Sequence, residues 1–251
     1  MRMEDLDPPR EPEGAAEQIL EQLDEFRLHW DGDVLYQSSR LQAYDAAIEK
    51  LQQANLCFNC TCTRPQVKAM GSVYNGHCRK LDLPKSEESA TRLLTEAVDI
   101  QFNDGVLGNY GQNIEQDAGD FIVKRKDGLH AYQLAVVVDD AHQEITHVVR
   151  GADLLDSTPR QIYLQHKLGY STPTYSHIPI LVNKEGQKLS KQHFARAIDS
   201  NESRELTFRA LELLGQEPPG SLKKETTRAQ LDWATEHWRI QAVPKLANIP
   251  L

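Results

Sequence analysis

The sequence predicts an α/β protein built on a parallel sheet, with a turn-rich cysteine segment and a mostly helical C-terminal part. Between residues 120 and 183, short apolar runs alternate with an amphipathic segment, an order typical of parallel strands buried on both faces. All four cysteines lie between residues 57 and 78. From about residue 202 the pattern is mostly helical, with a Pro-Pro-Gly break at 218–220.

The N-terminal part is predicted to contain two amphipathic helices. Segment 13–26 carries apolar residues at helical spacing, and segment 38–55 does the same. Ser38 or Ser39 stands where a helix cap is expected. The next predicted element is segment 120–128, a strand that enters a turn at its Asp-Gly end.

The central part is predicted to alternate strand, helix and strand. The apolar run 134–138 is predicted to be a buried strand that ends in Asp139-Asp140. Segment 152–168 is predicted to be a helix closed by Gly169, and segment 177–183 to be the next strand.

Composition and charge exclude several classes of protein. The 251 residues, 39% of them hydrophobic and 26% charged, suit one large or two small water-soluble domains. No signal-peptide pattern, long apolar run or polybasic tail occurs, which indicates a cytosolic protein outside the membrane. Residues 1–60 hold 13 acidic and 5 basic side chains, and the rest is close to neutral, so broad non-specific nucleic-acid binding is not expected.

The cysteine segment predicts a metal site. In a cytosolic protein, clustered cysteines are more often metal ligands or redox groups than disulfides. A close pair followed by a return cysteine is the usual layout of a small zinc loop, and zinc needs four donors. The Cys57-x-x-Cys60 pair also fits a redox dithiol, and buried apolar cysteines are a further alternative. Spacing alone leaves six candidate ligands: Cys57, Cys60, Cys62, Tyr74, His77 and Cys78.

Three stretches place polar groups beside predicted strands. Carboxylates at 4–7 stand near a probable strand end, where they would meet a ligand or form a solvated acidic turn. Tyr132 precedes the predicted strand 134–138, a position where an aromatic residue is usually part of the core. Arg150 ends an apolar strand and is suited to bind a carboxylate or phosphate, or is simply a surface arginine.

The fourth stretch is the glycine-led loop 186–192, in which two lysines flank a serine. Lys188 and Lys191 are placed to hold a polyphosphate as point charges. The sequence has no Gly-x4-Gly-Lys-Ser/Thr loop, so P-loop chemistry is excluded.

These motifs together resemble a known family. "KLSKQ" at 188–192 is similar to the lysine-rich signature loop of class I aminoacyl-tRNA synthetases. "RMEDLD", the cysteine segment, "AYQLAVVVDD" and "VVRGADL" follow in the order of the glutamyl-tRNA synthetases. The resemblance is greater to their short paralogues, the glutamyl-queuosine tRNA(Asp) synthetases, through "EDLDPPR", the Cys-x-Cys and Tyr-x-x-x-Cys spacing, and an end soon after the lysine loop.

The resemblance implies a domain plan. Residues 1–200 would form a Rossmann-like catalytic domain with a zinc-binding insertion at about 55–118, and 201–251 a helical segment, with no anticodon-binding domain. The family pattern selects Tyr74 over His77 as the fourth zinc ligand and leaves Cys57 as a spare thiol. The implied zinc ligands are Cys60, Cys62, Tyr74 and Cys78.

The resemblance also implies a reaction in two steps. Glutamate is activated with ATP and Mg²⁺, and the glutamyl group passes to queuosine at the wobble position of tRNA(Asp). Glutamate binding falls to Glu4, Tyr132 and Arg150. ATP binding falls to Lys188, Ser190 and Lys191, with Lys191 as the catalytic residue that stabilises the transferring phosphate. A monomer is expected.

Two rival functions remain at this stage: a glutamyl-tRNA synthetase that charges a tRNA 3′ end, and a non-catalytic, zinc-stabilised tRNA-binding module. Family chains begin with a strand and helix that carry ATP-binding motifs, and this sequence starts inside the strand that follows them, roughly 40 residues later. We therefore expect these 251 residues alone to bind zinc and to activate glutamate poorly.

Overall fold

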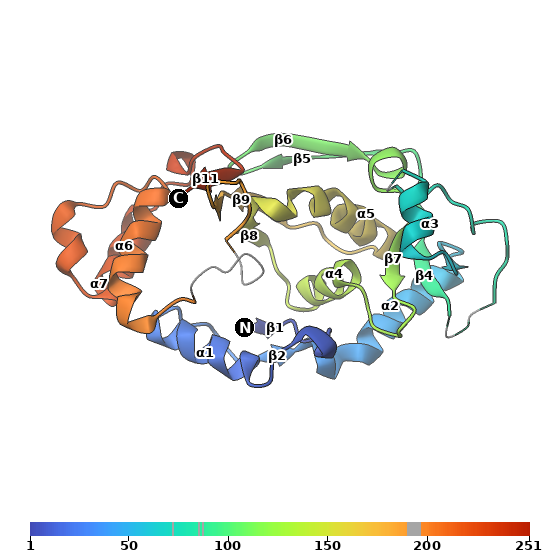
Figure 1. Ribbon diagram of the computed structural model, residues 1–251, viewed down its shortest axis with the longest axis horizontal. Coiled ribbons are helices and arrows are strands. Elements are labelled where there is room, and N and C mark those ends of the chain that lie inside the picture. The colour runs from blue at the N-terminus through green and yellow to red at the C-terminus, as the bar shows by residue number, and fades with distance from the viewer. Residues whose placement is uncertain (72, 85, 87, 190–196) are drawn as a thin grey trace.

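The computed structural model describes residues 1–71, 73–84, 86, 88–189 and 197–251. Helices α6 (Ser203–Leu213) and α7 (Thr227–His237) lie at one end of the molecule. Helix α3 (Arg64–Ala69) and strand β4 (Ala90–Leu93) lie toward the other end (Figure 1). None of the helices in the described ranges is long and apolar enough to cross a membrane.

The N-terminal residues form a parallel strand pair joined through a helix. Strand β1 (Arg2–Met3) pairs with β2 (Leu35–Tyr36), and α1 (Ala15–Glu25) lies between them in the chain. Helix α2 (Leu41–Gln53) follows and buries four residues at helical spacing, Tyr44, Ala47, Ile48 and Leu51. Both predicted N-terminal helices are therefore confirmed.

Antiparallel strands make up most of the cysteine-bearing insertion. Strand β3 (Cys57–Cys60) pairs with β4, which pairs with β7 (Phe121–Lys124), and a hairpin joins β5 (Asp99–Asp104) to β6 (Gly108–Asn113). The hairpin leads into a single π-helical turn at Ile114–Ala118. The strand predicted at the start of 120–128 is confirmed, although its partner is antiparallel.

The predicted strand 134–138 is wrong. These residues lie in helix α4 (Tyr132–His142), whose residues 134–140 are all buried. A short, continuous apolar run looks the same whether a strand or a helix is buried on every side, and only its neighbours in space decide between them. Helix α4 packs against α2 and α5, so every face of it is covered.

A strand–helix–strand unit is present at 147–182, but its first strand is the apolar one predicted to end at Arg150 and not 134–138. Strand β8 (His147–Gly151) runs parallel to β9 (Thr174–Ile178), with Arg150 opposite His177. Helix α5 (Thr158–Leu168) connects them and ends at Gly169, whose φ of +69° is the left-handed conformation that favours glycine. The predicted strand 177–183 is divided at Pro179, which lacks a backbone donor, into β9 and β10 (Ile180–Val182).

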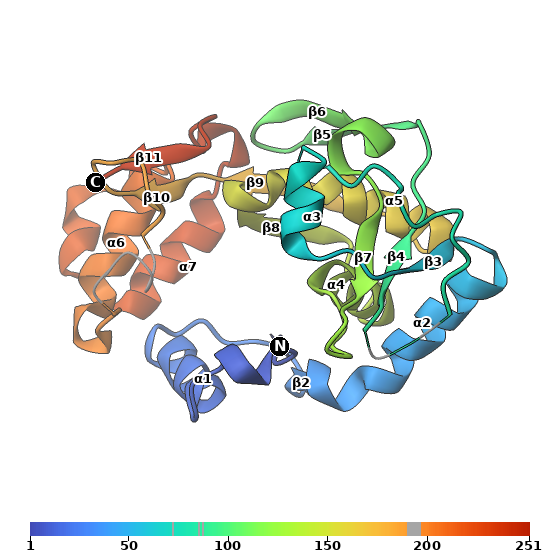
Figure 2. The ribbon, with the colours of Figure 1, turned by 45° about the vertical axis from the view of Figure 1, so that its right-hand side comes forward.

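The C-terminal segment is helical, as predicted, and returns to the sheet at its end. Helices α6 and α7 pack together, and β11 (Asn248–Pro250) pairs in parallel with β10. Figure 2 shows this pair beside α6 and α7. The main core lies between α2, α4, α5 and the strands of the insertion, and includes Leu51, Leu93, Ile114, Leu134 and Leu164.

Candidate functional site

Three cysteines converge on one point. Cys60 ends β3, Cys62 precedes α3, and Cys78 lies in a turn, yet their sulfur atoms all lie within 4.8 Å of one another. The Cys62 and Cys78 sulfurs are 3.6 Å apart, too far for a disulfide bond of about 2.05 Å. Two thiolates on a tetrahedral zinc, with bonds of about 2.3 Å, would stand about 3.8 Å apart. The spacing therefore fits a metal site.

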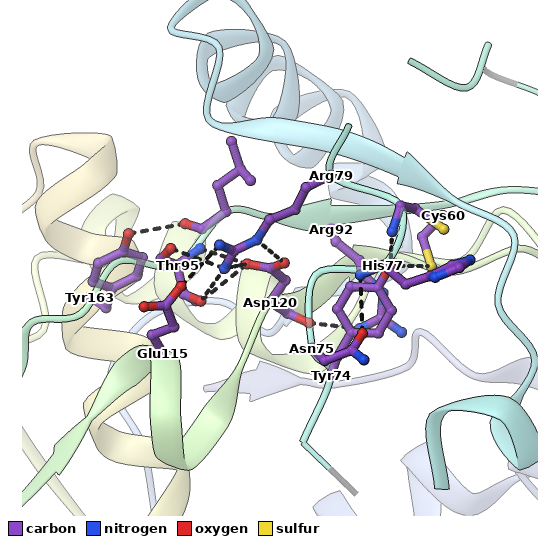
Figure 3. Close-up of polar contacts among 12 residues, drawn as sticks. Cys60, Tyr74, Asn75, His77, Arg79, Arg92, Thr95, Glu115, Asp120 and Tyr163 are labelled. Atoms are coloured by element: carbon purple, nitrogen blue, oxygen red, sulfur yellow. Dashed lines mark hydrogen bonds and ion pairs between the residues drawn. The ribbon is translucent and has the colours of Figure 1, made fainter. Parts of the chain in front are cut away.

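The Tyr74 hydroxyl lies beside these thiols. It lies 3.5 Å from the Cys60 sulfur and accepts the Cys78 backbone N–H at 2.7 Å (Figure 3). His77 is exposed and lies outside the group of metal-binding side chains. Cys57 also lies outside it and packs against the main core, where burial raises the pKa of its thiol to about 12.

Arg92 is the cation of this cluster. It is 6% exposed, and its guanidinium lies 3.9 Å from the centre of the Tyr74 ring. Burial disfavours the thiolate of Cys60, but hydrogen bonds from Tyr74 and Arg92 outweigh it and lower the pKa of Cys60 to about 7. The thiolate is the form that binds metal. Three thiolates and a tyrosinate on Zn²⁺ would carry a net negative charge, which Arg92 partly offsets.

A second network fastens the cysteine turn to the rest of the protein. Arg79, next to Cys78, donates to both oxygens of the fully buried Asp120, at 2.6 and 2.7 Å, and to Glu115 at 2.9 Å. Asp120 also accepts the Thr95 backbone N–H (Figure 3). The position of Cys78 is thereby tied to the start of β7.

Glu4 and Tyr132 share one cavity. Glu4 follows β1, Tyr132 is the first residue of α4, and both line a cavity of about 450 Å³. The Glu4 carboxylate accepts from Arg2 at 3.2 Å. Burial raises the pKa of Tyr132, the Glu4 carboxylate raises it further, and the Arg150 guanidinium opposes both. All three residues predicted for glutamate are therefore electrostatically coupled.

Arg150 is held by a buried relay that the sequence analysis missed. Its Nε donates to Nε2 of His177 at 3.1 Å, and its Nη2 donates to the Thr158 hydroxyl at 2.7 Å. Asp104 lies on the far side of the imidazole, 2.6 Å from Nδ1. His177 is 0% and Asp104 2% exposed. A histidine directly before the apolar run 178–182 was the available signal for this relay.

The first lysine of the lysine loop lies near the end of β8, the strand that carries Arg150. Lys188 forms an ion pair with Asp153, three residues after Arg150 in the chain, at 2.5 Å. Ser190 and Lys191 lie outside the described residues. The structure thus brings Lys188 close to the end of β8.

Comparison with known proteins establishes the class. Residues 1–232 match the family described as tRNA synthetases class I (E and Q), catalytic domain, and the chain belongs to this family. Its sequence is 44% identical to the glutamyl-Q tRNA(Asp) synthetase of Pseudomonas aeruginosa over 250 residues, all of this chain and 85% of that protein. The protein of the same name from Neisseria meningitidis is 47% identical over 262 residues, all of this chain and 87% of that one.

A solved structure shares the fold. The glutamate-tRNA synthetase of Elizabethkingia anophelis superimposes with a TM-score of 0.75 at 22% identity, covering 99% of this chain. The chain spans 60% of the length of that synthetase. The predicted α/β fold of a class I synthetase catalytic domain is confirmed.

Proposed function

We propose that this protein activates L-glutamate with ATP and transfers the glutamyl group to queuosine in tRNA(Asp). The observation that carries this proposal is the identity of 44–47%, over the whole chain, with proteins named glutamyl-Q tRNA(Asp) synthetase. ATP and tRNA are cytoplasmic, and we propose that the protein acts there as a monomer.

In the first step, an oxygen of the glutamate α-carboxylate attacks the α-phosphorus of ATP and pyrophosphate leaves. The carboxylate is already ionised at neutral pH, so no side chain has to remove a proton. In our proposal Glu4 pairs with the substrate ammonium group and Arg150 with a carboxylate. The Tyr132 hydroxyl, beside Glu4 in the same cavity, orients the substrate.

Lys191 stabilises the negative charge that moves onto pyrophosphate, while Lys188 and Ser190 hold the ATP phosphates. Mg²⁺ accompanies the nucleotide. In the second step a hydroxyl of the queuosine ring attacks the glutamyl carbonyl and AMP leaves. Cys60, Cys62, Tyr74 and Cys78 would hold a structural zinc, which crosslinks the insertion.

The test uses the full product of the gene with radiolabelled glutamate and ATP, offering tRNA(Asp) or tRNA(Glu) separately. We expect a base-labile label on tRNA(Asp) that maps to its anticodon and is lost when periodate first cleaves the queuosine diol. Label on the 3′ end of tRNA(Glu) would identify a glutamyl-tRNA synthetase instead. Absence of label with both, in a preparation that binds tRNA, would identify a non-catalytic tRNA-binding module.

A further inference from the structure

A second cavity, next to the cysteine cluster, is lined by an unusual number of cations. It measures about 480 Å³ and lies between α3, β4, β7 and the start of α5. Its positively charged lining residues are Arg64, Lys68, Arg92 and Arg160. The chain as a whole carries a net charge of −9, so this concentration of positive charge is a local feature.

The charge of this cavity is neutralised only in part within the described residues, where Arg92 faces the Cys60 thiolate. Asp120 is the one carboxylate among the described lining residues, and Arg79 occupies both of its oxygens. The Nε atoms of Arg92 and Arg160 are buried without an acceptor. Arg92 is itself 94% buried, since its exposure is 6%. A buried donor without a partner is costly, so an external acceptor at this wall of the cavity would be stabilising.

The cavity adjoins the one that contains Glu4 and Tyr132. Arg64 and Ile122 line both cavities, and Gln133, next to Tyr132 on α4, lines the cationic one. An anion bound among the arginines would therefore lie beside the proposed glutamate site. Lys188, which we assign to ATP, pairs with Asp153 and does not line this cavity.

We propose that the cationic cavity binds a backbone phosphate of the tRNA, next to the nucleoside that receives the glutamyl group. Phosphate accepts hydrogen bonds from guanidinium groups in pairs and would satisfy the buried Nε donors. Arg160 and Arg92 form the inner wall, and Arg64 and Lys68 on α3 form the exposed rim. That the phosphate belongs to RNA rests on the proposed function. A single phosphate contact would position the RNA without reading its sequence.

The test measures binding of queuosine-containing tRNA(Asp) to the 251-residue chain as a function of salt. Arg160→Gln and Lys68→Gln are compared with Arg228→Gln, an exposed arginine on α7 whose side chain is 65% exposed. We expect each cavity variant to weaken tRNA binding about 10-fold at low salt and to reduce the salt slope by about 1, because one phosphate contact is lost. Arg228→Gln should bind like the unaltered chain.

Controls separate this proposal from its alternatives. Zinc content and thermal melting establish whether each variant is folded. If Arg160→Gln does not fold, Lys68→Gln, at an exposed position, still tests the cavity. Unchanged tRNA affinity in the folded cavity variants overturns the proposal. The proposal is also overturned if the cavity variants lose affinity for ATP or inorganic phosphate but still bind tRNA, because the anion bound in the cavity would then not be RNA. If the variants lose tRNA binding but the full gene product glutamylates no tRNA, the cavity stands and the proposed function fails.

Discussion

Arg150 is oriented by a histidine that has to be neutral. Asp104 accepts the Nδ1 proton of His177, which leaves the lone pair of Nε2 to accept from Arg150. A proton on Nε2 would instead face the guanidinium. Because the imidazole is fully buried, water cannot substitute for either partner. This arrangement makes His177 a positioning residue for the proposed glutamate site.

Replacing His177 by Ala should therefore affect glutamate more than ATP. We expect the KM for glutamate to rise about 10-fold, since Arg150 loses a hydrogen bond that fixes its orientation, while the KM for ATP changes little. Steady-state kinetics of the full gene product measure both. His147→Ala, at an exposed position of the same strand pair, is the control. Equal effects on both substrates would show that His177 has only a general structural role.

The same histidine predicts a pH dependence of stability. Burial lowers the pKa of His177, and Arg150 lowers it further, against the opposing effect of Asp104. A lowered pKa in the folded state means that the unfolded chain binds the proton more tightly. The stabilisation is therefore complete above the ordinary pKa of about 6.5 and is lost as the pH falls below it. Urea unfolding measures the free energy of unfolding at pH 7.5 and at pH 5.5. Between these two values it should fall more in the unaltered chain than in His177→Gln. An equal fall in both proteins would contradict this prediction.

At the scale of elements, the cysteine segment 60–78 has little core of its own. Its cluster of buried hydrophobic residues consists of Cys60, Tyr74 and Cys78, so most of its fully buried groups are also candidate metal ligands. Helix α3 begins with a capping box between Thr63 and Gln66, which stabilises one turn only locally. We therefore expect metal binding to be the main source of folding energy for this segment.

We expect the purified protein to hold about one zinc per chain, and Cys78→Ser to lose the zinc and much of its thermal stability. Cys57→Ala should retain the metal, because Cys57 lies outside the cluster. Removing a residue that only hydrogen-bonds to a metal ligand already lowers metal affinity about 10-fold. We expect the loss of a direct ligand to cost at least as much, so Tyr74→Phe should release zinc to a chelator at least about 10-fold more readily than His77→Ala. Mass spectrometry and a colorimetric chelator assay measure this. A normally folded protein without zinc would refute the metal site.

Buried carboxylates join the elements of the catalytic part. Asp139 on α4 is fully buried and accepts from Gln37, Arg40 and Tyr44, all from the segment around the start of α2. Asp140, next to it, pairs with Arg2, the first residue of β1. These contacts hold the N-terminal strand pair against α4, which places Glu4 beside Tyr132.

At the scale of the whole molecule, the proposed active site is assembled from distant segments. Glu4 follows β1, Tyr132 begins α4, Arg150 lies on β8, and Lys188 reaches back to Asp153 after β8. Glu4, Tyr132 and Arg150 each lie at or near the end of an element. Such a site depends on the packing of the parallel strand pairs and α4 as one unit.

Lys191→Ala should slow the activation step about 10²-fold or more, because one charged contact to the transition state is lost. Glutamate-dependent exchange of pyrophosphate into ATP, measured on the full gene product, reports this step. Lys184→Ala, an exposed lysine two residues before the loop, is the matched control. An unchanged exchange rate in Lys191→Ala would show that Lys191 does not act on ATP in the activation step.

The sequence by itself determined the local features of this protein. The spacing of Cys60, Cys62 and Cys78, the helix ended by Gly169, and the β8–α5–β9 unit all depend on residues close together in the chain, where spacing and backbone preference act directly. Only the tertiary structure decided that 134–138 is helical, because a run buried on all faces has no periodicity of its own. It also joined Asp104, His177 and Arg150, since contacts across tens of residues depend on how the elements pack.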